Sequence, residues 1–173
     1  MQKKYTKSFA LIHWIHAILI TLVLVGGLIN LPDLPKSGEE LQPFKMHIIM
    51  GVLVFVVLII RVILLKKQPT LEPLDVNKSR EFFINLNHRL IYIFITLTAI
   101  SGIATAKSAN IGQVVIFGKD PSVYTGANGI TAIFAQIHTI SAYTLLVLII
   151  MHILGVISYI AKGNKEIIKR VWI

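Results

Sequence analysis

Four long apolar stretches limit what this chain can fold into more than any other feature. They run from about Phe9 to Leu31, His47 to Leu65, Leu86 to Ala106 and Ile130 to Ala161. A helix needs about 20 mainly apolar residues to cross the hydrocarbon core of a bilayer. The fourth stretch is longer than one crossing requires, so we expect it to tilt or to project past the membrane.

The composition of the chain agrees with contact between these stretches and lipid. Charged residues make up 14% of the sequence and hydrophobic residues 55%, whereas typical soluble proteins are about 25% charged. A soluble fold with so little charge could not cover its own surface. We therefore predict an all-α integral membrane protein, a four-helix bundle in which residues 1–173 form a single domain and membrane lipid is a partner.

The first stretch predicts an uncleaved membrane anchor. Lys3, Lys4 and Lys7 precede it, as they would in a secretory signal peptide. The apolar run is too long for a signal peptide, however, and it ends at Asn30 and Leu31 without the small residues of a cleavage site.

Lysine and arginine residues fall mainly on one side of the predicted spans. Twelve lie at the N-terminus, in the second connection and in the C-terminal tail. Four lie on the other side, namely Lys36, Lys45, Lys107 and Lys119. Because basic residues favour the cytoplasmic side, both termini are predicted to be cytoplasmic. This arrangement explains the net charge of +9 without nucleic acid as a partner.

The third connection contains a short apolar stretch, Val114 to Phe117, between Gly112 and Gly118. It suits an interfacial segment on the outer membrane face and a plain surface loop equally well.

Histidines are concentrated in or beside the spans. An ionisable side chain at membrane depth is costly and usually has a partner and a role. One such histidine is easily explained by a hydrogen bond to a neighbouring helix, but a larger set is not. The six are His13, His16, His47, His88, His138 and His152.

The spacing of two of these histidines indicates two separate sites. His138 and His152 are 14 residues apart on one predicted helix, which brings them to nearly the same helix face about 21 Å apart along the axis. His47 begins the second span level with His138, while His13, His16 and His88 lie near the depth of His152.

Two imidazoles from different helices suit haem iron. The chain has no cysteine, which excludes iron–sulfur clusters and thiolate metal sites. Zinc would require three or four protein ligands at one depth, whereas haem iron accepts two axial histidines.

Other residues fit a haem site but also have ordinary explanations. Gly51, Ser141 and Gly155 follow histidines by one helical turn and could leave room for a porphyrin, or could simply favour helix packing. Arg61 lies 14 residues after His47 on the same helix face. It could pair with a haem propionate or extend to the membrane surface.

Several short motifs occur in a recognisable order. Lys4-Tyr5 and Ile12-His13-Trp14 open the chain, His47 is followed by Arg61, and His88-Arg89-Leu90-Ile91-Tyr92 lies near the start of the third span. The pair His138 and His152 ends the series. In length, spans and motif order the whole chain resembles the bacterial cytochrome b561 family, which includes superoxide oxidases.

The resemblance implies two haem b groups, each held by two histidines. His47 and His138 would hold the outer haem, and His13 and His152 the cytoplasmic one, which leaves His88 for a quinone site. Members with superoxide oxidase activity have a histidine about seven residues after the last ligand, where this chain has Tyr159. Tyrosine can still donate a hydrogen bond to a quinone, although its pKa near 10 makes it a poorer proton carrier. His16 matches no part of the family pattern, and we expect it to be a supporting or packing residue.

These observations predict an oxidoreductase of the bacterial inner membrane that passes electrons from an outer-side donor to ubiquinone. The resemblance makes superoxide the leading donor, and Lys107 is the outer-side charge best suited to attract it. The alternative is a membrane-anchor subunit that exchanges electrons with a partner dehydrogenase or hydrogenase. A transporter is disfavoured, because the spans show no repeat and contain no proline.

Overall fold

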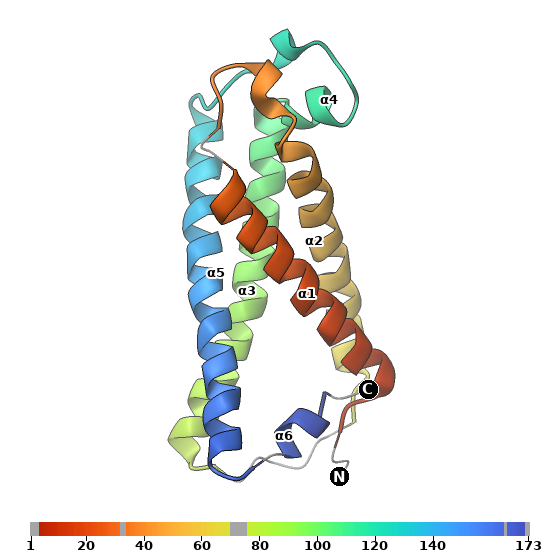
Figure 1. The fold of residues 1–173 in the computed structure, drawn as a ribbon, viewed down its shortest axis with the longest axis vertical. Helices are drawn as coiled ribbons and strands as arrows, with labels where there is room; N and C mark the ends of the chain where they lie inside the picture. Colours follow the sequence, from red (N-terminus) through yellow and green to blue (C-terminus); the bar gives the residue numbers. More distant parts are fainter. Residues whose placement is uncertain (1–3, 32–33, 70–75, 165, 172–173) are drawn as a thin grey trace.

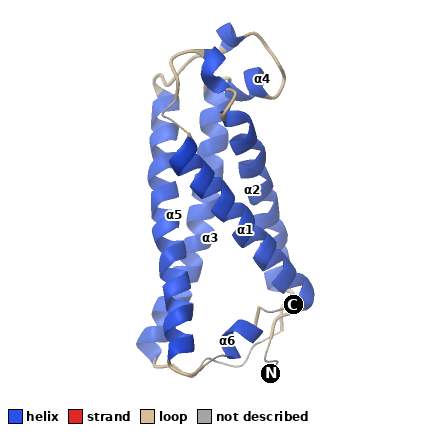
Figure 2. Ribbon diagram, viewed as in Figure 1, coloured by secondary structure: helices blue, strands red, loops and turns tan. Residues whose placement is uncertain are grey.

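Each of the four apolar stretches forms one continuous helix in the computed structural model, which describes residues 4–31, 34–69, 76–164 and 166–171. The long helices are α1 (Lys7–Asn30), α2 (Phe44–Lys66), α3 (Lys78–Ser108) and α5 (Ile130–Ala161). Short helical segments lie between and after them: η1 (Gly38–Leu41), α4 (Ile111–Val115), η2 (Pro121–Val123) and α6 (Glu166–Lys169). No strand occurs within the described ranges (Figure 2). The predicted all-α four-helix fold is confirmed.

Side-chain caps explain where two of the long helices begin. The Thr6 side chain accepts a hydrogen bond from the Phe9 backbone N–H at the start of α1. Asn77 does the same for the Arg80 N–H at the start of α3. Such caps satisfy backbone donors that have no partner within the helix. They explain why α3 begins eight residues before the predicted apolar stretch at Leu86.

All four long helices are long and apolar enough to cross a membrane. Their outward faces carry large apolar side chains, for example Ile29, which is 74% exposed, and Ile93, which is 56% exposed. Water would disfavour so much exposed apolar surface, whereas lipid tails accommodate it. The protein is therefore a multi-pass membrane protein.

The helices run alternately up and down. In sequence order, α1 packs against α2, α2 against α3, and α3 along its length against α5 (Figure 1). Both termini lie at one end, which we call the basic end because Lys66, Lys67, Arg80 and Lys162 lie there. Lys3, which precedes the first apolar stretch, lies outside the described residues.

The opposite end, here called the capped end, is covered by the two outer connections. Leu41 of η1 packs with Ala109, Ile111 and Val115 in a buried apolar cluster. The Tyr124 hydroxyl donates a hydrogen bond of 2.8 Å to the Pro35 carbonyl and so ties one connection to the other. Of the two readings of the third connection, a bare surface loop does not describe all of it, because Val114 and Val115 are buried in the packed helix α4, while Ile116 and Phe117 beyond it are exposed.

Backbone contacts close the basic end. The Trp14 indole N–H donates to the Val171 carbonyl at 2.9 Å, and the Tyr5 N–H donates to the Arg170 carbonyl at 3.1 Å. The C-terminal segment that includes α6 therefore crosses from α5 to the start of α1 (Figure 1).

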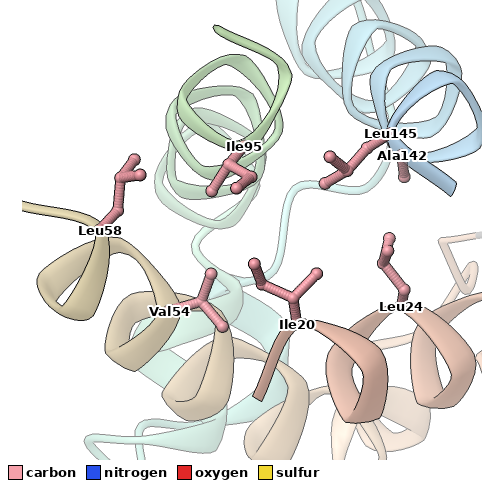
Figure 3. Packing of buried hydrophobic residues seen from close by; sticks show 7 residues of the cluster. All are labelled: Ile20, Leu24, Val54, Leu58, Ile95, Ala142 and Leu145. Atoms are coloured by element: carbon pink, nitrogen blue, oxygen red, sulfur yellow. The ribbon is translucent and has the colours of Figure 1, made fainter. Parts of the chain in front are cut away.

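The centre of the bundle is an apolar layer to which every long helix contributes. Ile20, Val54, Ile95 and Leu145 are 2–7% exposed and belong to one cluster. Figure 3 shows them converging from the four helices together with Leu24, Leu58 and Ala142. We call this set the middle layer, and it separates the two ends of the bundle.

The middle layer gives a direct test of the packing. Ile95→Ala removes a side chain that is 2% exposed and should lower the free energy of unfolding in detergent by about 2–4 kcal/mol. Ile93→Ala is the matched control on the same helix, because Ile93 is 56% exposed and leaves no cavity when truncated. Equal melting temperatures for the two variants would contradict the observed orientation of α3.

Candidate functional site

Polar residues form two layers, one on each side of the middle layer. Moving seven residues in either direction from the four middle-layer residues Ile20, Val54, Ile95 and Leu145 reaches a residue of one of these layers. Seven residues are nearly two helical turns, so each step of about 10 Å stays on the inner face. The capped-end layer is Gly27, His47, Gly102 and His138, and the basic-end layer is His13, Arg61, His88 and His152.

Two histidine rings face each other in the capped-end layer. The ring centroids of His47 on α2 and His138 on α5 are 6.0 Å apart, and the ring planes are nearly perpendicular at 88°. The His138 Nδ1 lies 2.8 Å from the Thr98 carbonyl oxygen. A carbonyl can only accept, so Nδ1 carries the proton and the lone pair of Nε2 is available for a metal.

Glycines complete the capped-end layer. A Cβ atom on Gly27 would lie 2.7 Å from the His47 ring, and one on Gly102 would lie 2.8 Å from the His138 ring. Real Cβ atoms do not approach so closely, so only glycine gives these rings their present space. By contrast, a Cβ atom on Gly51 or Gly155 would meet nothing within 4 Å.

The basic-end layer holds a second pair of histidine rings. The His88 and His152 ring centroids are 5.0 Å apart. His88 Nδ1 lies 2.8 Å from the Ile84 carbonyl oxygen, which again places the proton on Nδ1 and leaves Nε2 free. The His88 side chain is exposed at the surface of α3, whereas that of His152 is half-buried.

His13 has a different partner in the same layer. The Arg61 guanidinium, whose Nη2 is 2.7 Å away, donates a hydrogen bond to His13 Nδ1. Arginine can only donate, so Nδ1 is the acceptor and the proton is on Nε2. Metal binding through Nε2 would therefore require the guanidinium to move away. His13 also lies within electrostatic range of His152, His88 and His16.

Arg61 is directed into the bundle. Its guanidinium carbon lies 5.8 Å from the centroid of the Phe9 ring and 5.2 Å from that of the Tyr92 ring. Both contacts are within the range of cation–π attraction. Of the two readings of Arg61, extension to the membrane surface does not describe this side chain.

His16 is the most buried of the histidines. It is 0% exposed, and neither ring nitrogen has a hydrogen-bond partner among the described residues. The Val54 backbone approaches the ring but does not meet hydrogen-bond geometry.

Tyr159 lies seven residues beyond His152 towards the basic end of α5. The tyrosine is 7% exposed, and the Arg80 guanidinium carbon lies 5.3 Å from its ring centroid. Arg80 also donates a 3.4 Å hydrogen bond to the Ser158 hydroxyl. The His88 ring thus contacts that of His152, while Tyr159 lies about 10 Å further along the α5 axis.

Lys107 is exposed at the capped end beside a hollow of about 380 Å³. Asn110, Gln113 and Phe117 line the same hollow. Nearby in sequence, hydrogen bonds from Ser122 hold the pKa of the Asp120 carboxyl below its usual value, so Asp120 remains anionic at neutral pH. Its charge opposes the positive field of Lys107 and Lys119.

Ligand clusters for a bare metal ion do not occur in the part of the chain that the structure describes. No group of three or more histidine, cysteine, aspartate or glutamate side chains there is placed so that it could hold a metal ion. Pairs of histidines from different helices remain, which is the donor set that haem iron uses.

The family model for prokaryotic cytochrome b561 matches residues 4–172. The chain belongs to the prokaryotic cytochrome b561 family. This cytochrome matches no curated protein and no solved structure. Family membership makes it a b-type membrane cytochrome that binds haem b and transfers electrons.

The observed residues fit haem b. His138 has a free Nε2 and its ring lies 6.0 Å from that of His47, and Gly27 and Gly102 leave open the space that a Cβ atom would fill. The predicted importance of Gly51 and Gly155 has no contact to support it. Gly27 and Gly102 were missed, although the sequence held a signal: each lies 14 residues after a histidine, His13 and His88.

The glycine contacts yield a prediction about haem binding. Gly27→Ala should displace the His47 ring at a cost of about 1–3 kcal/mol, which corresponds to roughly 5- to 150-fold weaker binding of one haem. Haem titration of the apoprotein measures the change.

Gly26→Ala is the matched control for this experiment, since a Cβ atom there meets nothing within 4 Å. If Gly27→Ala binds haem as tightly as Gly26→Ala does, the glycine does not shape the site.

Proposed function

We propose that this cytochrome carries two haem b groups, stacked across the membrane, and passes electrons from an outer-side donor to quinone. The observation that supports the proposal is the pair of polar layers, each with a facing histidine pair, separated by the apolar middle layer. Bound haem b supplies a one-electron carrier at each depth. With two axial histidines no position on the iron is left open, so substrates exchange electrons at the haem edge.

His47 and His138 hold the outer haem in this proposal. They lie on α2 and α5, which are not neighbours in the order of packing. A porphyrin lies between its two axial ligands, so the ligands must come from helices that leave space between them. The Thr98 carbonyl fixes the orientation of the His138 ring.

His13 and His152 hold the cytoplasmic haem by the same reasoning. α1 packs mainly against α2, and α5 mainly against α3. His88 and His152 are closer to each other, but they lie on the helix pair that packs along its whole length. The tight packing of α3 on α5 leaves no space for a porphyrin between those two helices. For His13 to hold the haem through Nε2, the guanidinium of Arg61 would have to leave His13 Nδ1, and it would then be available to a propionate.

Pairwise substitutions test the assignment of the ligands. His47→Ala and His138→Ala should each remove the same haem, and His13→Ala and His152→Ala should each remove the other. Low-temperature reduced-minus-oxidised spectra and redox titration distinguish the haem that remains.

The decisive comparison is between His13 and His88. If His88→Ala strips the second haem and His13→Ala does not, His88 is the ligand, as its free Nε2 would allow. Loss of different haems from His47→Ala and His138→Ala would contradict the outer pairing.

His88 then belongs to the quinone site near the cytoplasmic face. Its side chain is exposed, and Nε2, an acceptor in this tautomer, is available to a quinol hydroxyl, while a protonated ring would donate from Nε2 to a quinone oxygen. Tyr159 contributes a hydroxyl donor further along α5, beside Arg80. Ubiquinone is the proposed acceptor, and it takes up two electrons and two protons to form the quinol.

Superoxide is the proposed outer donor, and two superoxide anions give up two electrons to leave two molecules of dioxygen. Lys107 is the residue proposed to guide the anion, since it is exposed beside a hollow at the capped end. This places the capped end outside the bacterial inner membrane and both termini in the cytoplasm, in agreement with the basic residues at the other end.

Charge steering makes this proposal measurable. In stopped-flow mixing with superoxide, Lys107→Gln should reduce the second-order rate of haem reduction a few-fold, and the difference should shrink as salt rises. Lys66→Gln makes the same charge change at the basic end and should leave the rate unchanged.

Failure of superoxide to reduce the purified protein would remove it as the donor. The alternative is then a membrane-anchor subunit that takes electrons from an outer-side redox partner such as a dehydrogenase or hydrogenase. Equal rates for Lys107→Gln and the parent protein would contradict the role of Lys107 alone.

A further inference from the structure

Three buried nitrogen atoms at the junction of α1 and α2 have no hydrogen-bond partner among the described residues. They are Nδ1 and Nε2 of His16 and Nε of Arg61. Burial of an unpaired polar group costs free energy, and native structures usually satisfy such groups with protein, water or a ligand. The site is therefore incomplete as the chain alone builds it.

The two side chains belong to one neighbourhood. His16 is one helical turn inward from His13 on α1, and His13 accepts a hydrogen bond from Arg61. The charge of Arg61 acts directly on the His16 ring. Because His16 is 0% exposed, neither lipid nor bulk water reaches it.

The charge of Arg61 also lacks a counterion from the long helices. α1, α2 and α5 contain no aspartate or glutamate, and Glu81 of α3 lies in the first turn of that helix. A buried guanidinium without an anionic partner is strongly disfavoured. The missing group is therefore an anion that the four long helices do not supply.

The donors define the chemistry of that anion. Arg61 Nε offers one N–H, and the neutral His16 ring offers another. A carboxylate has two oxygens that accept such bonds, and charge-assisted pairs of this kind are among the stronger hydrogen bonds in proteins.

We propose that His16 and Arg61 form a carboxylate-binding site, and that its occupant is a propionate of the cytoplasmic haem. This inference rests on the proposed function, which places that haem at His13 and His152. Of the two roles expected from the sequence, His16 thereby takes the supporting one, as a cofactor-positioning residue, and not the packing one.

A comparison of haem with its ester measures the contribution of the propionate carboxylates to haem retention. Protohaem and its dimethyl ester have the same iron and ring, but the ester has no propionate anions. The test measures the rate at which each leaves the cytoplasmic site for apomyoglobin, with the outer haem as an internal reference. The parent protein should release the ester about a hundredfold faster than protohaem, as expected for the loss of two hydrogen bonds to a charged group, one from each donor.

Two substitutions identify the donor. His16→Phe keeps a ring but removes the N–H, so it should release protohaem about tenfold faster and leave the release of the ester unchanged. His16→Gln retains an N–H donor and should restore most of the retention. Tyr124→Phe removes a hydrogen bond at the capped end and should alter neither rate.

The outcomes distinguish a haem propionate from a free carboxylate as the occupant. They also distinguish failure of the carboxylate site from failure of the proposed function. Equal release rates for protohaem and its ester from the parent protein would show that the propionate assignment is wrong. If acetate then protects the apo form of the parent protein, but not that of His16→Phe, against thermal unfolding, the occupant is a free carboxylate. Equal acceleration of both haem forms by His16→Phe would overturn the carboxylate site and leave a packing role. The haem content of the parent protein reports on the proposed function separately, because fewer than two haems would overturn that proposal.

Discussion

Placing an imidazole inside a membrane is costly, and the rest of this structure is arranged around that cost. Lipid cannot hydrogen-bond a ring nitrogen, so each histidine must find a partner on a neighbouring helix or in a cofactor. The chain meets this requirement by confining its polar groups to two levels. His138 is hydrogen-bonded to the Thr98 carbonyl and His13 to Arg61, while apolar side chains such as Ile95 fill the space between the two levels.

The seven-residue step is what keeps the two levels separate on every helix. Gly27, Ile20 and His13 follow this step on α1, and His138, Leu145 and His152 follow it on α5. Because a seven-residue step returns nearly to the same helix face, each long helix places one apolar middle-layer residue between one residue of the capped-end layer and one of the basic-end layer. The arrangement keeps the two polar levels apart, with the apolar middle layer between them.

Much of this arrangement could be predicted from the sequence. Long apolar stretches report directly on membrane helices, and the bounds of α5 agree with the predicted stretch. The facing of His47 and His138 also followed from topology, since both were expected at one depth. These features depend on helix geometry and chain direction, which the sequence encodes locally.

Features that depend on contact between helices were harder to predict from the sequence. Gly51 and Gly155 looked suitable because they lie one turn from histidines, but the glycines that meet histidine rings are Gly27 and Gly102, on other helices. The contact of His88 with His152 and the complete burial of His16 likewise depend on which helix faces which. The start of α3 was missed because its first turns are polar and are held by the Asn77 cap.

Haem stoichiometry tests the central claim most directly. The purified protein should contain two haem b groups per chain when haem is quantified against protein mass, and its reduced-minus-oxidised spectrum should be that of b-type haem. Two levels of histidine on one helix face require this number. A reproducible value of one haem per chain, in protein supplied with excess haem, would contradict the account.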